Sequence, residues 1–413
     1  MVTSMGTDSF GGMRPVEPTR LGAKESVPIE LPLSLYVHFP WCVKKCPYCD
    51  FNSHALRGEL PEAEYVDALL RDFDFELAQP ETRRISSVFF GGGTPSLFSP
   101  AGVGRVLEHA ARRLGLASDV EITLEANPGT ADAANFRGYR AAGVNRLSIG
   151  VQSLDAGQLK RLGRIHDPDE ARGALELARA AGFDNVNLDL MYALPRQTPP
   201  QARADLEAAI ALAPEHLSYY QLTLEPNTEF HAHPPKLPDD DAAWAMQEQG
   251  QALLAAHGYA QYEVSAYARP GRRCRHNLNY WQFGDYLGIG AGAHGKRTRV
   301  GPPGAGAGVV ERRARHKHPR TYVERAGSPG AIQEQRVVPD ADLPFEFAMN
   351  ALRLREGFRL AEFERRTGLP AAGLEPALGQ AAARGWLERE ADRVRPSASG
   401  RALLNPLVGL FLP

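Results

Sequence analysis

The stretch that decides the fold is Ser34–Phe39 together with the loop after it, Cys42-Val-Lys-Lys-Cys46-Pro-Tyr-Cys49. The first part is an apolar run typical of a buried strand, and the second carries three cysteines with C-x3-C-x2-C spacing. Thiolates are soft ligands that favour iron–sulfur or zinc over hard cations. A [4Fe–4S] cube normally takes four cysteines, so three leave one iron with an open position that a methionine moiety can chelate. We expect a [4Fe–4S] cluster on Cys42, Cys46 and Cys49.

Two other interpretations of the three cysteines stay open. One is a zinc site completed by His54 or Cys274, although a zinc ribbon normally needs a second C-x2-C pair, which the sequence lacks. The other is a set of inert buried thiols. A disulfide framework would spread its cysteines more evenly, so the pattern indicates a reducing compartment, and we expect the protein in the cytoplasm.

Apolar strand-like runs alternate with helical stretches from about residue 34 to residue 225. Further strands are predicted at Ile85–Phe90, Val120–Glu125, Arg146–Val151, Val186–Met191 and His216–Leu222. Helix starts are marked by Ser99-Pro100, Asp167-Pro168 and Thr198-Pro199. Repeated βα units imply parallel strands with right-handed crossovers. Because six units are too few for a closed eight-stranded barrel, we predict an α/β fold with an open, partial (β/α)6 barrel. A doubly wound sheet is the alternative.

The rest of the chain divides into segments of different character. Residues 1–32 are predicted to form a mobile N-terminal arm, 33–235 the partial barrel, 236–343 a connecting region and 344–413 a C-terminal domain. The connecting region should hold a helix over 238–258, a strand over Gln261–Ala266 and an irregular excursion over 301–342. The C-terminal helices are followed by a hairpin from Trp386–Glu390 and Arg393–Pro396, an order typical of a winged-helix-like α+β domain.

Composition excludes several classes of protein. The formal net charge is −2, which gives no global basic footprint for nucleic acid. The basic run Arg312–Arg320 lacks an aromatic stacking platform, so a solvated loop is favoured there over an RNA site. No apolar stretch approaches the ~20 residues of a membrane helix, and the N-terminus lacks the apolar centre of a secretory signal. Membrane contact should therefore be peripheral at most.

Polar groups recur where the predicted parallel strands end. They are Tyr36 before the cysteine loop, Gly91–Gly93 with Thr94 after the second strand, then Glu125, Gln152, Arg164 and Asp189. Ligands of parallel barrels bind at this edge, and glycines let backbone amides approach a ligand closely. Each residue alone is equally well explained as structural. Together they predict a site for the ribose hydroxyls and ammonium group of S-adenosylmethionine (SAM).

These residues closely resemble the HemN/HemW branch of radical SAM proteins, and the resemblance runs from Leu33 onward. It rests on the cysteine loop and on five further motifs: Phe90-Gly-Gly-Gly-Thr-Pro-Ser, Glu125-Ala-Asn-Pro, Ser148-Ile-Gly-Val-Gln152, Leu162-Gly-Arg164 and Asn187-Leu-Asp189. It implies a partial barrel with a C-terminal domain. It also implies a SAM site that includes Tyr36, Tyr48, Phe51, Gly92, Gly93, Thr94, Glu125, Gln152, Arg164 and Asp189.

Two features separate the branches of this family. Oxygen-independent coproporphyrinogen oxidases usually carry a further cysteine where this chain has Phe51, whereas the haem chaperones carry H-N-x-x-Y-W, found here as His276–Trp281. The resemblance thus implies a chaperone that binds haem and passes it to acceptor apo-proteins, with a homodimer as a possible assembly. The alternatives are a coproporphyrinogen III dehydrogenase and a radical SAM enzyme with another substrate. Whether the chain is an enzyme stays open.

The segment around His276 offers the groups that haem needs. Imidazole is a common axial ligand of haem iron. Aromatic side chains that follow His276 are suited to cover the macrocycle, and Arg272, Arg273 and Arg275 are suited to meet its propionates. The competing interpretation is an aromatic core segment whose histidine caps a turn.

Overall fold

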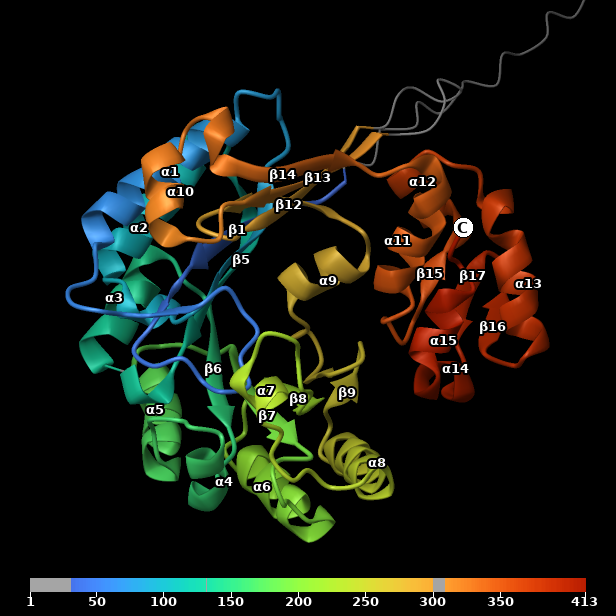
Figure 1. The fold of residues 1–413 in the computed structure, drawn as a ribbon, viewed down its shortest axis with the longest axis horizontal. Helices are drawn as coiled ribbons and strands as arrows, with labels where there is room; N and C mark the ends of the chain where they lie inside the picture. The colour runs from blue at the N-terminus through green and yellow to red at the C-terminus, as the bar shows by residue number, and fades with distance from the viewer. Residues whose placement is uncertain (1–30, 131, 300–308) are drawn as a thin grey trace, which may run out of the picture. The chain divides into compact units, whose positions relative to one another are not determined.

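The computed structural model describes residues 31–130, 132–299 and 309–413 of the chain. The predicted mobile arm, residues 1–32, lies outside the described residues except for its last two. Figure 1 shows the described elements in order from blue to red. Within the described residues, no helix combines the length and the apolar character that crossing a membrane requires.

Six parallel strands form the centre of the main sheet. They are β1 (Leu33–Phe39), β4 (Ile85–Gly92), β5 (Leu116–Ala126), β6 (Arg146–Gln152), β7 (Val186–Tyr192) and β8 (His216–Gln221). Each strand pairs with the next one along the chain. A doubly wound sheet would reverse this order at a switch point. The uninterrupted order therefore confirms the partial (β/α)6 barrel.

Helices connect these strands as right-handed crossovers require. They are α1 (Glu62–Glu76), α2 (Pro100–Arg113), α3 (Ala133–Ala142), α4 (Ala156–Arg161), α5 (Pro168–Ala180) and α6 (Pro199–Ala211), followed after β8 by α7 (Glu229–Ala232) and α8 (Asp240–Ala256). The predicted helix starts are confirmed. Ser99 caps α2 through Gly102 N, and both Asp167 and Thr198 form capping boxes.

The sheet continues beyond both ends of the parallel array. A seventh parallel strand, β11 (Asp285–Ile289), pairs with β1, and β12 (His294–Arg299), β13 (Val309–Arg315) and β14 (Ile332–Val337) follow antiparallel. At the other end β10 (Ala266–Ala268) pairs antiparallel with β8, and β9 (Ala260–Gln261) pairs antiparallel with β10. The order ends at β14 and β9, so over the described residues the barrel stays open.

Two predictions for the connecting region are wrong. The single strand Gln261–Ala266 is instead the hairpin of β9 and β10, because residues 262–265 form the turn between them. The excursion 301–342 is not irregular where it is described: it contains β13, α10 (Pro319–Arg325) and β14. Residues 301–308 of that prediction lie outside the described residues. The predicted boundaries at residues 235 and 343 stay a prediction.

The C-terminal segment has its own hydrophobic core and the predicted order of helices and wing. Its elements are α11 (Leu343–Ala351), β15 (Phe358–Arg359), α12 (Leu360–Thr367), α13 (Glu375–Ala383), β16 (Leu387–Glu390), β17 (Arg393–Pro396), α14 (Ala398–Ala402) and α15 (Leu404–Gly409). The hairpin β16–β17 is confirmed, and β15 adds a third strand beside β17. Phe283, in the turn before β11, and Val310 of β13 belong to the same core, which joins the segment to β11–β13.

Short elements complete the chain. The two-residue strands β2 (Trp41–Cys42) and β3 (His54–Ala55) pair in parallel, and α9 (Arg275–Trp281) precedes β11. Single 3-10 turns occur at Pro95–Leu97, Pro128–Thr130, Pro329–Ala331, Asp340–Asp342 and Ala371–Leu374.

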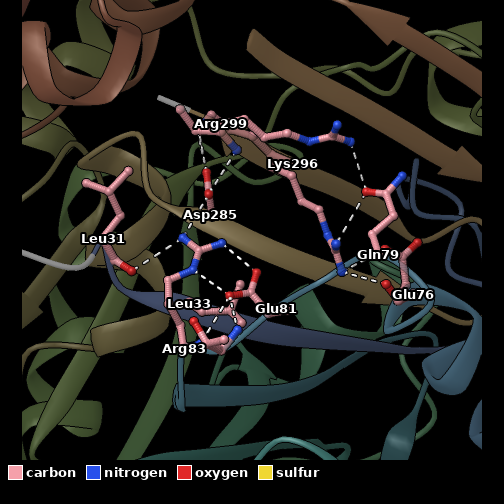
Figure 2. A network of polar contacts seen from close by, with 12 residues as sticks. Leu31, Leu33, Glu76, Gln79, Glu81, Arg83, Asp285, Lys296 and Arg299 are labelled. Atoms are coloured by element: carbon pink, nitrogen blue, oxygen red, sulfur yellow. Dashed lines mark hydrogen bonds and ion pairs between the residues drawn. The ribbon is translucent and has the colours of Figure 1, made fainter. Parts of the chain in front are cut away.

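A buried ionic network holds β11 in the sheet (Figure 2). Asp285, the first residue of β11, is fully buried and accepts from Lys296 Nζ at 2.9 Å and from Arg83 Nη1 at 2.9 Å. Thr298 adds its backbone N at 2.9 Å and its hydroxyl at 2.7 Å. Burial raises the pKa of Asp285, but Lys296 and Arg83 outweigh it, so the pKa lies below its ordinary value. One carboxylate thus ties β11 to β12 and to the residues before β4.

Asp285→Asn should lower the free energy of unfolding by about 3–5 kcal/mol, because it leaves the buried Lys296 ammonium without its carboxylate. The loss should be full at neutral pH. It should shrink as the pH falls below about 4, where the wild-type carboxylate also takes up a proton. Urea unfolding at several pH values measures both effects. Asp169→Asn, which breaks only the exposed pair with Arg172, is the matched control and should cost at most about 1 kcal/mol. Equal losses in the two variants would contradict this account.

Candidate cofactor site

The cysteine loop is closed at its base by backbone hydrogen bonds. His54 N donates to Pro40 O at 2.7 Å and Leu56 N donates to Cys42 O at 2.8 Å, which are the bonds of the β2–β3 pair. The chain therefore leaves β1, forms the loop and returns to the same place. Cys42, Cys46 and Cys49 are free thiols, each partly exposed. The loop is thus a fixed excursion at the carboxyl end of the first strand.

The environment of the thiols favours the protonated form unless a cation binds. Burial raises the pKa of Cys42 and of Cys49, although hydrogen bonds from Thr94 and Ser53 oppose the effect. Arg164 Nη1 lies 3.6 Å from Cys46 Sγ. Among the described residues, it is the one cationic group that is hydrogen-bonded to a thiol of the loop. Thiolates are the metal-binding form of cysteine. A positively charged metal group would therefore release these protons on binding.

The described residues contain no set of three histidine, cysteine or acidic side chains that converges on a single metal position. Three thiolates on one loop are one ligand short of a structural zinc site, which takes four. A [4Fe–4S] cluster is bound through different iron atoms, so its thiolates need not converge. The donor set fits the cluster better than it fits zinc.

A cavity of about 350 Å³ lies over the loop and the carboxyl ends of the strands. Its wall includes the three cysteines and most of the other predicted residues: Tyr48, Phe51, Gly92, Gly93, Thr94, Glu125, Gln152, Arg164 and Asp189. Residues from β4, β5, β6, β7 and β8 all contribute. The strand-end pattern of the sequence thus corresponds to one site. Tyr36 and His276 are not part of this wall.

Two glycines at the end of β4 are required by close packing. Gly92 has φ of +116°, and a Cβ there would lie 2.6 Å from the His38 ring. A Cβ on Gly93 would lie 2.5 Å from Trp41 O. Larger residues at these positions would push the turn away from the cysteine loop. The turn is held there by backbone hydrogen bonds, from Gly93 N to Phe39 O at 2.7 Å and from Thr94 N to Trp41 O at 2.8 Å.

Glu125 is a partly buried carboxyl group near the end of β5. Its Oε2 accepts from Gly92 N at 3.1 Å. Burial, with Asp189 second, raises the pKa of Glu125 to about 8. Burial also raises the pKa of Asp189, despite hydrogen bonds from Asn187 at 2.8 Å and Ser148 at 3.3 Å. Two partly buried carboxyl groups in one cavity favour a ligand that brings positive charge and hydrogen-bond donors.

Gln152 and Arg164 approach the cavity from the end of β6 and the turn after α4. Gln152 has φ of +69°, an uncommon conformation for this residue, and its Oε1 accepts from Tyr220 OH at 2.7 Å. Arg164 follows Gly163, where a Cβ would lie 2.9 Å from Pro47 of the cysteine loop. The Nε of Arg164 is buried and has no partner within the described residues. Both side chains are held in place with hydrogen-bonding capacity to spare.

Tyr36 lies behind the cavity wall. Its hydroxyl is 2.9 Å from His38 Nδ1, and the other ring nitrogen of His38 is 2.9 Å from Asn52 O in the cysteine loop. The Tyr36 ring faces the glycine turn, since a Cβ on Gly91 would lie 3.1 Å from this ring. The structure therefore places Tyr36 as a support for the turn and for the loop.

His276 lies in a buried aromatic cluster on α9. Its ring stacks on Phe89 at 4.9 Å and faces the edge of Tyr280 at 4.9 Å, with Tyr36 at 6.2 Å. Nδ1 is 3.3 Å from Ser87 Oγ, while Nε2 is buried and has no partner in the described part of the chain. Burial lowers the pKa of His276 to about 3. The imidazole is therefore neutral, and one nitrogen keeps its lone pair or its proton free.

The arginines suggested for haem propionates are otherwise engaged. Arg272 pairs with Asp184 at 3.2 Å, Arg273 with Glu356 at 2.8 Å and Arg275 with Asp119 at 2.7 Å. Each pair is at the surface, so the arrangement does not leave these guanidinium groups free for a ligand.

Asn127, which was named in the motif after the third strand, also lines the cavity, whereas Ser148, Met191, Ser218 and Tyr220 were given no role by the sequence analysis. Ser148 and Ser218 lie on strands β6 and β8, and they contact Asp189 or its neighbour Asn187. The signal was the two-residue alternation of strands, which puts every second side chain near the ends of β6–β8 on one face. A search limited to the last residue of each strand overlooks them.

Comparison with known proteins identifies the group to which this architecture belongs. Residues 36–209 match the Radical SAM superfamily, and residues 338–403 match the HemN C-terminal domain. The solved structure of coproporphyrinogen III oxidase (HemN) from Escherichia coli superposes with a TM-score of 0.76 at 24% identity, over 92% of this chain and 90% of that one. This likeness shows a shared fold.

Sequence relatives are closer. The heme chaperone HemW of Escherichia coli (strain K12) is 52% identical over 92% of this chain and 98% of its own length. HemW of Haemophilus influenzae is 47% identical with the same coverage of both chains. Identity at this level over nearly the whole of both proteins exceeds what a shared fold alone requires. The chain belongs to the HemW family of the radical SAM superfamily.

Proposed function

We propose that this protein is a haem chaperone: it binds haem and transfers it to acceptor apo-proteins, with a [4Fe–4S] cluster and SAM in the cavity of the barrel. The observation that carries the proposal is the 52% identity to a relative named heme chaperone HemW. The chain also has Phe51 in its cysteine loop and His276–Trp281 before β11. A cytoplasmic location, a homodimer and at most peripheral membrane contact belong to the same proposal.

Cys42, Cys46 and Cys49 are the residues that would hold the cluster. The β2–β3 pair fixes the loop before any metal binds, and Arg164 offsets negative charge at Cys46. When bound, the cluster would supply an iron with an open coordination position and a source of single electrons.

The cavity wall would bind SAM. Glu125 and Asp189 suit its cationic and hydroxyl groups, Gln152 and Arg164 have free hydrogen-bonding capacity, and Gly92 and Gly93 let the backbone approach. Tyr48, Phe51 and Thr94 would cover the ligand from the side of the loop and the glycine turn. Tyr36 would act indirectly, by holding His38 and the turn in position.

Cys46→Ser should abolish assembly of a stable cluster, because it removes one of three iron ligands. The readouts are iron and sulfide content and the visible absorption after anaerobic reconstitution. Cys274→Ser is the matched control. Cys274 is a buried thiol whose Sγ lies 3.6 Å from Glu121 Oε1, and it is not part of the cavity wall. Loss of the cluster in both variants, or in neither, would contradict the ligand assignment.

SAM affinity should increase with pH up to about 8. Glu125 has a raised pKa of about 8 in the free protein, so below that pH the cationic ligand must displace a proton from it. Each pH unit below the pKa should cost up to roughly tenfold in affinity. Glu125→Gln should weaken binding and remove this dependence. Titration of cluster-loaded protein with SAM at several pH values gives the result, and an unchanged slope in the variant would assign the proton elsewhere.

His276 is proposed as a haem ligand because its Nε2 is buried without a partner. It is 2% exposed, so α9 must shift for iron to reach it. His276→Ala should weaken haem binding at least about tenfold. Even the loss of an outer-shell partner of a metal site typically costs about that much affinity. Haem titration followed by the Soret band tests this. His257→Ala, at the end of α8, is the control and should bind haem as wild type does.

Turnover of coproporphyrinogen III distinguishes the alternative function, a dehydrogenase, from the haem chaperone. Wild-type protein with cluster, SAM and a reductant should leave this substrate unchanged while still binding haem. Turnover without stoichiometric haem binding would favour the dehydrogenase and sink the chaperone.

A further inference from the structure

A second cavity of about 300 Å³ lies outside the site of the cluster. It is bounded by α8, by the turn between β9 and β10, by the segment after α11 and by α14 with the start of α15. The barrel region and the C-terminal segment therefore both contribute to its wall. The function proposed above assigns no role to this cavity.

Three arginines in this wall lack a carboxylate partner. Arg353, Arg355 and Arg401 form no ion pair within the described residues. Other arginines of the same segment do: Arg389 pairs with Glu375 at 2.8 Å and Arg395 with Glu388 at 2.8 Å. Unpaired guanidinium groups that share a cavity attract an anion, and carboxylates match their geometry.

Arg353 is the most constrained of the three. Its guanidinium lies over the Trp281 ring at 4.4 Å, and its Nε is buried with no partner in the described structure. Its side chain appears in none of the hydrogen bonds of the described residues, although burial lowers its pKa and so disfavours its charge. Arg353 is only partly buried as a whole, but a buried Nε without a hydrogen-bond partner is costly. The cost would be offset by an anionic ligand.

Glu263 is the second unsatisfied group in the same wall. It is 3% exposed, and its Oε2 has no partner among the described residues. It accepts from Ser265 Oγ at 3.3 Å through Oε1, and it lies too far from Arg353 for an ion pair. Burial raises its pKa above the ordinary value. A protonated Glu263 can donate a hydrogen bond to a bound carboxylate.

The mouth of the cavity adds a flat apolar surface. Trp244 on α8 is 46% exposed, an unusual exposure for a tryptophan, and Val264, Leu352 and Leu404 line the wall beside it. A ligand that carries carboxylates on an extended aromatic body would satisfy both halves of this site.

We propose that this cavity binds the propionate edge of haem: Arg353, Arg355 and Arg401 take the carboxylates, Glu263 donates a hydrogen bond to one of them, and Trp244 faces the macrocycle. The inference rests on the proposed function, since it assumes that haem is the cargo. It gives Trp281 of the H-N-x-x-Y-W motif the task of a positioning residue, because its ring holds Arg353. Small dicarboxylates share the carboxylate chemistry and lack only the aromatic body.

The test is haem titration of full-length protein with Arg353→Gln and, separately, Arg401→Gln. Each should weaken binding roughly tenfold, the usual effect of losing one charge-assisted hydrogen bond. Arg384→Gln is the matched control, since Arg384 lies over Trp386 at 4.9 Å but outside this cavity; it should leave affinity unchanged. Arg401 is only partly buried, so its variant keeps the test open if Arg353→Gln fails to fold.

Haem dimethyl ester, which lacks the carboxylates, should bind wild-type protein about as weakly as the arginine variants bind haem. Glu263→Gln should not weaken haem binding, because an amide also donates a hydrogen bond. Wild-type affinity in both arginine variants, or equal affinity for haem and its ester, would overturn the inference and leave the chaperone function standing. Displacement of haem by micromolar succinate would also overturn it, in favour of a small dicarboxylate. Wild-type protein that binds no haem would overturn the proposed function and this inference together.

Discussion

Parallel pairing in chain order is the constraint on which the site depends. When each strand lies beside the next and every crossover has the same hand, all carboxyl ends meet at one edge of the sheet. The cysteine loop after β1, the glycine turn after β4 and Glu125, Gln152 and Asp189 on later strands then reach one cavity from distant parts of the chain. A single strand out of order would scatter them. The seventh strand, β11, fixes β1 from its other side and so fixes the origin of the loop.

The cavity contains carboxyl groups that the protein itself does not fully compensate. Glu125 and Asp189 are partly buried and their pKa values are raised, and Arg164 and the three thiols line the same cavity. A folded protein tolerates such groups where a ligand compensates for them, which is why perturbed pKa values gather at functional sites. The contrast with the network of Asp285 is informative. There Lys296, Arg83 and Thr298 satisfy the carboxylate completely, and the pKa falls. Similar carboxyl groups thus serve stability in one place and binding in the other.

The sequence predicted what depends on local pattern and missed what depends on distant pairs. Apolar runs such as Val186–Met191 and caps such as Asp167 identify their own elements. Strand β13 reads Val-Val-Glu-Arg-Arg-Ala-Arg, which resembles a solvated loop, yet Arg315 is buried against Asp72 and Glu76 on α1. Those partners are more than 200 residues away, so no local signal announces that the charges are neutralised. The parallel strand β11, which follows the aromatic segment, was not predicted for a related reason. The first residue of this strand is a buried aspartate.

The two ends of the motif His276–Trp281 lie in different environments, and its first and last residues therefore have different roles. His276 is sealed among Phe89, Tyr280 and Tyr36, close to the strand that leads into the cysteine loop, whereas Trp281 faces Arg353 and the C-terminal segment. Helix α9 is only seven residues long and connects these two regions directly. A ligand anchored through Arg353 at one end would pull on the same short helix that covers His276 at the other. The two ends of the motif therefore lie on one short helix, between the aromatic cluster around His276 and the C-terminal segment.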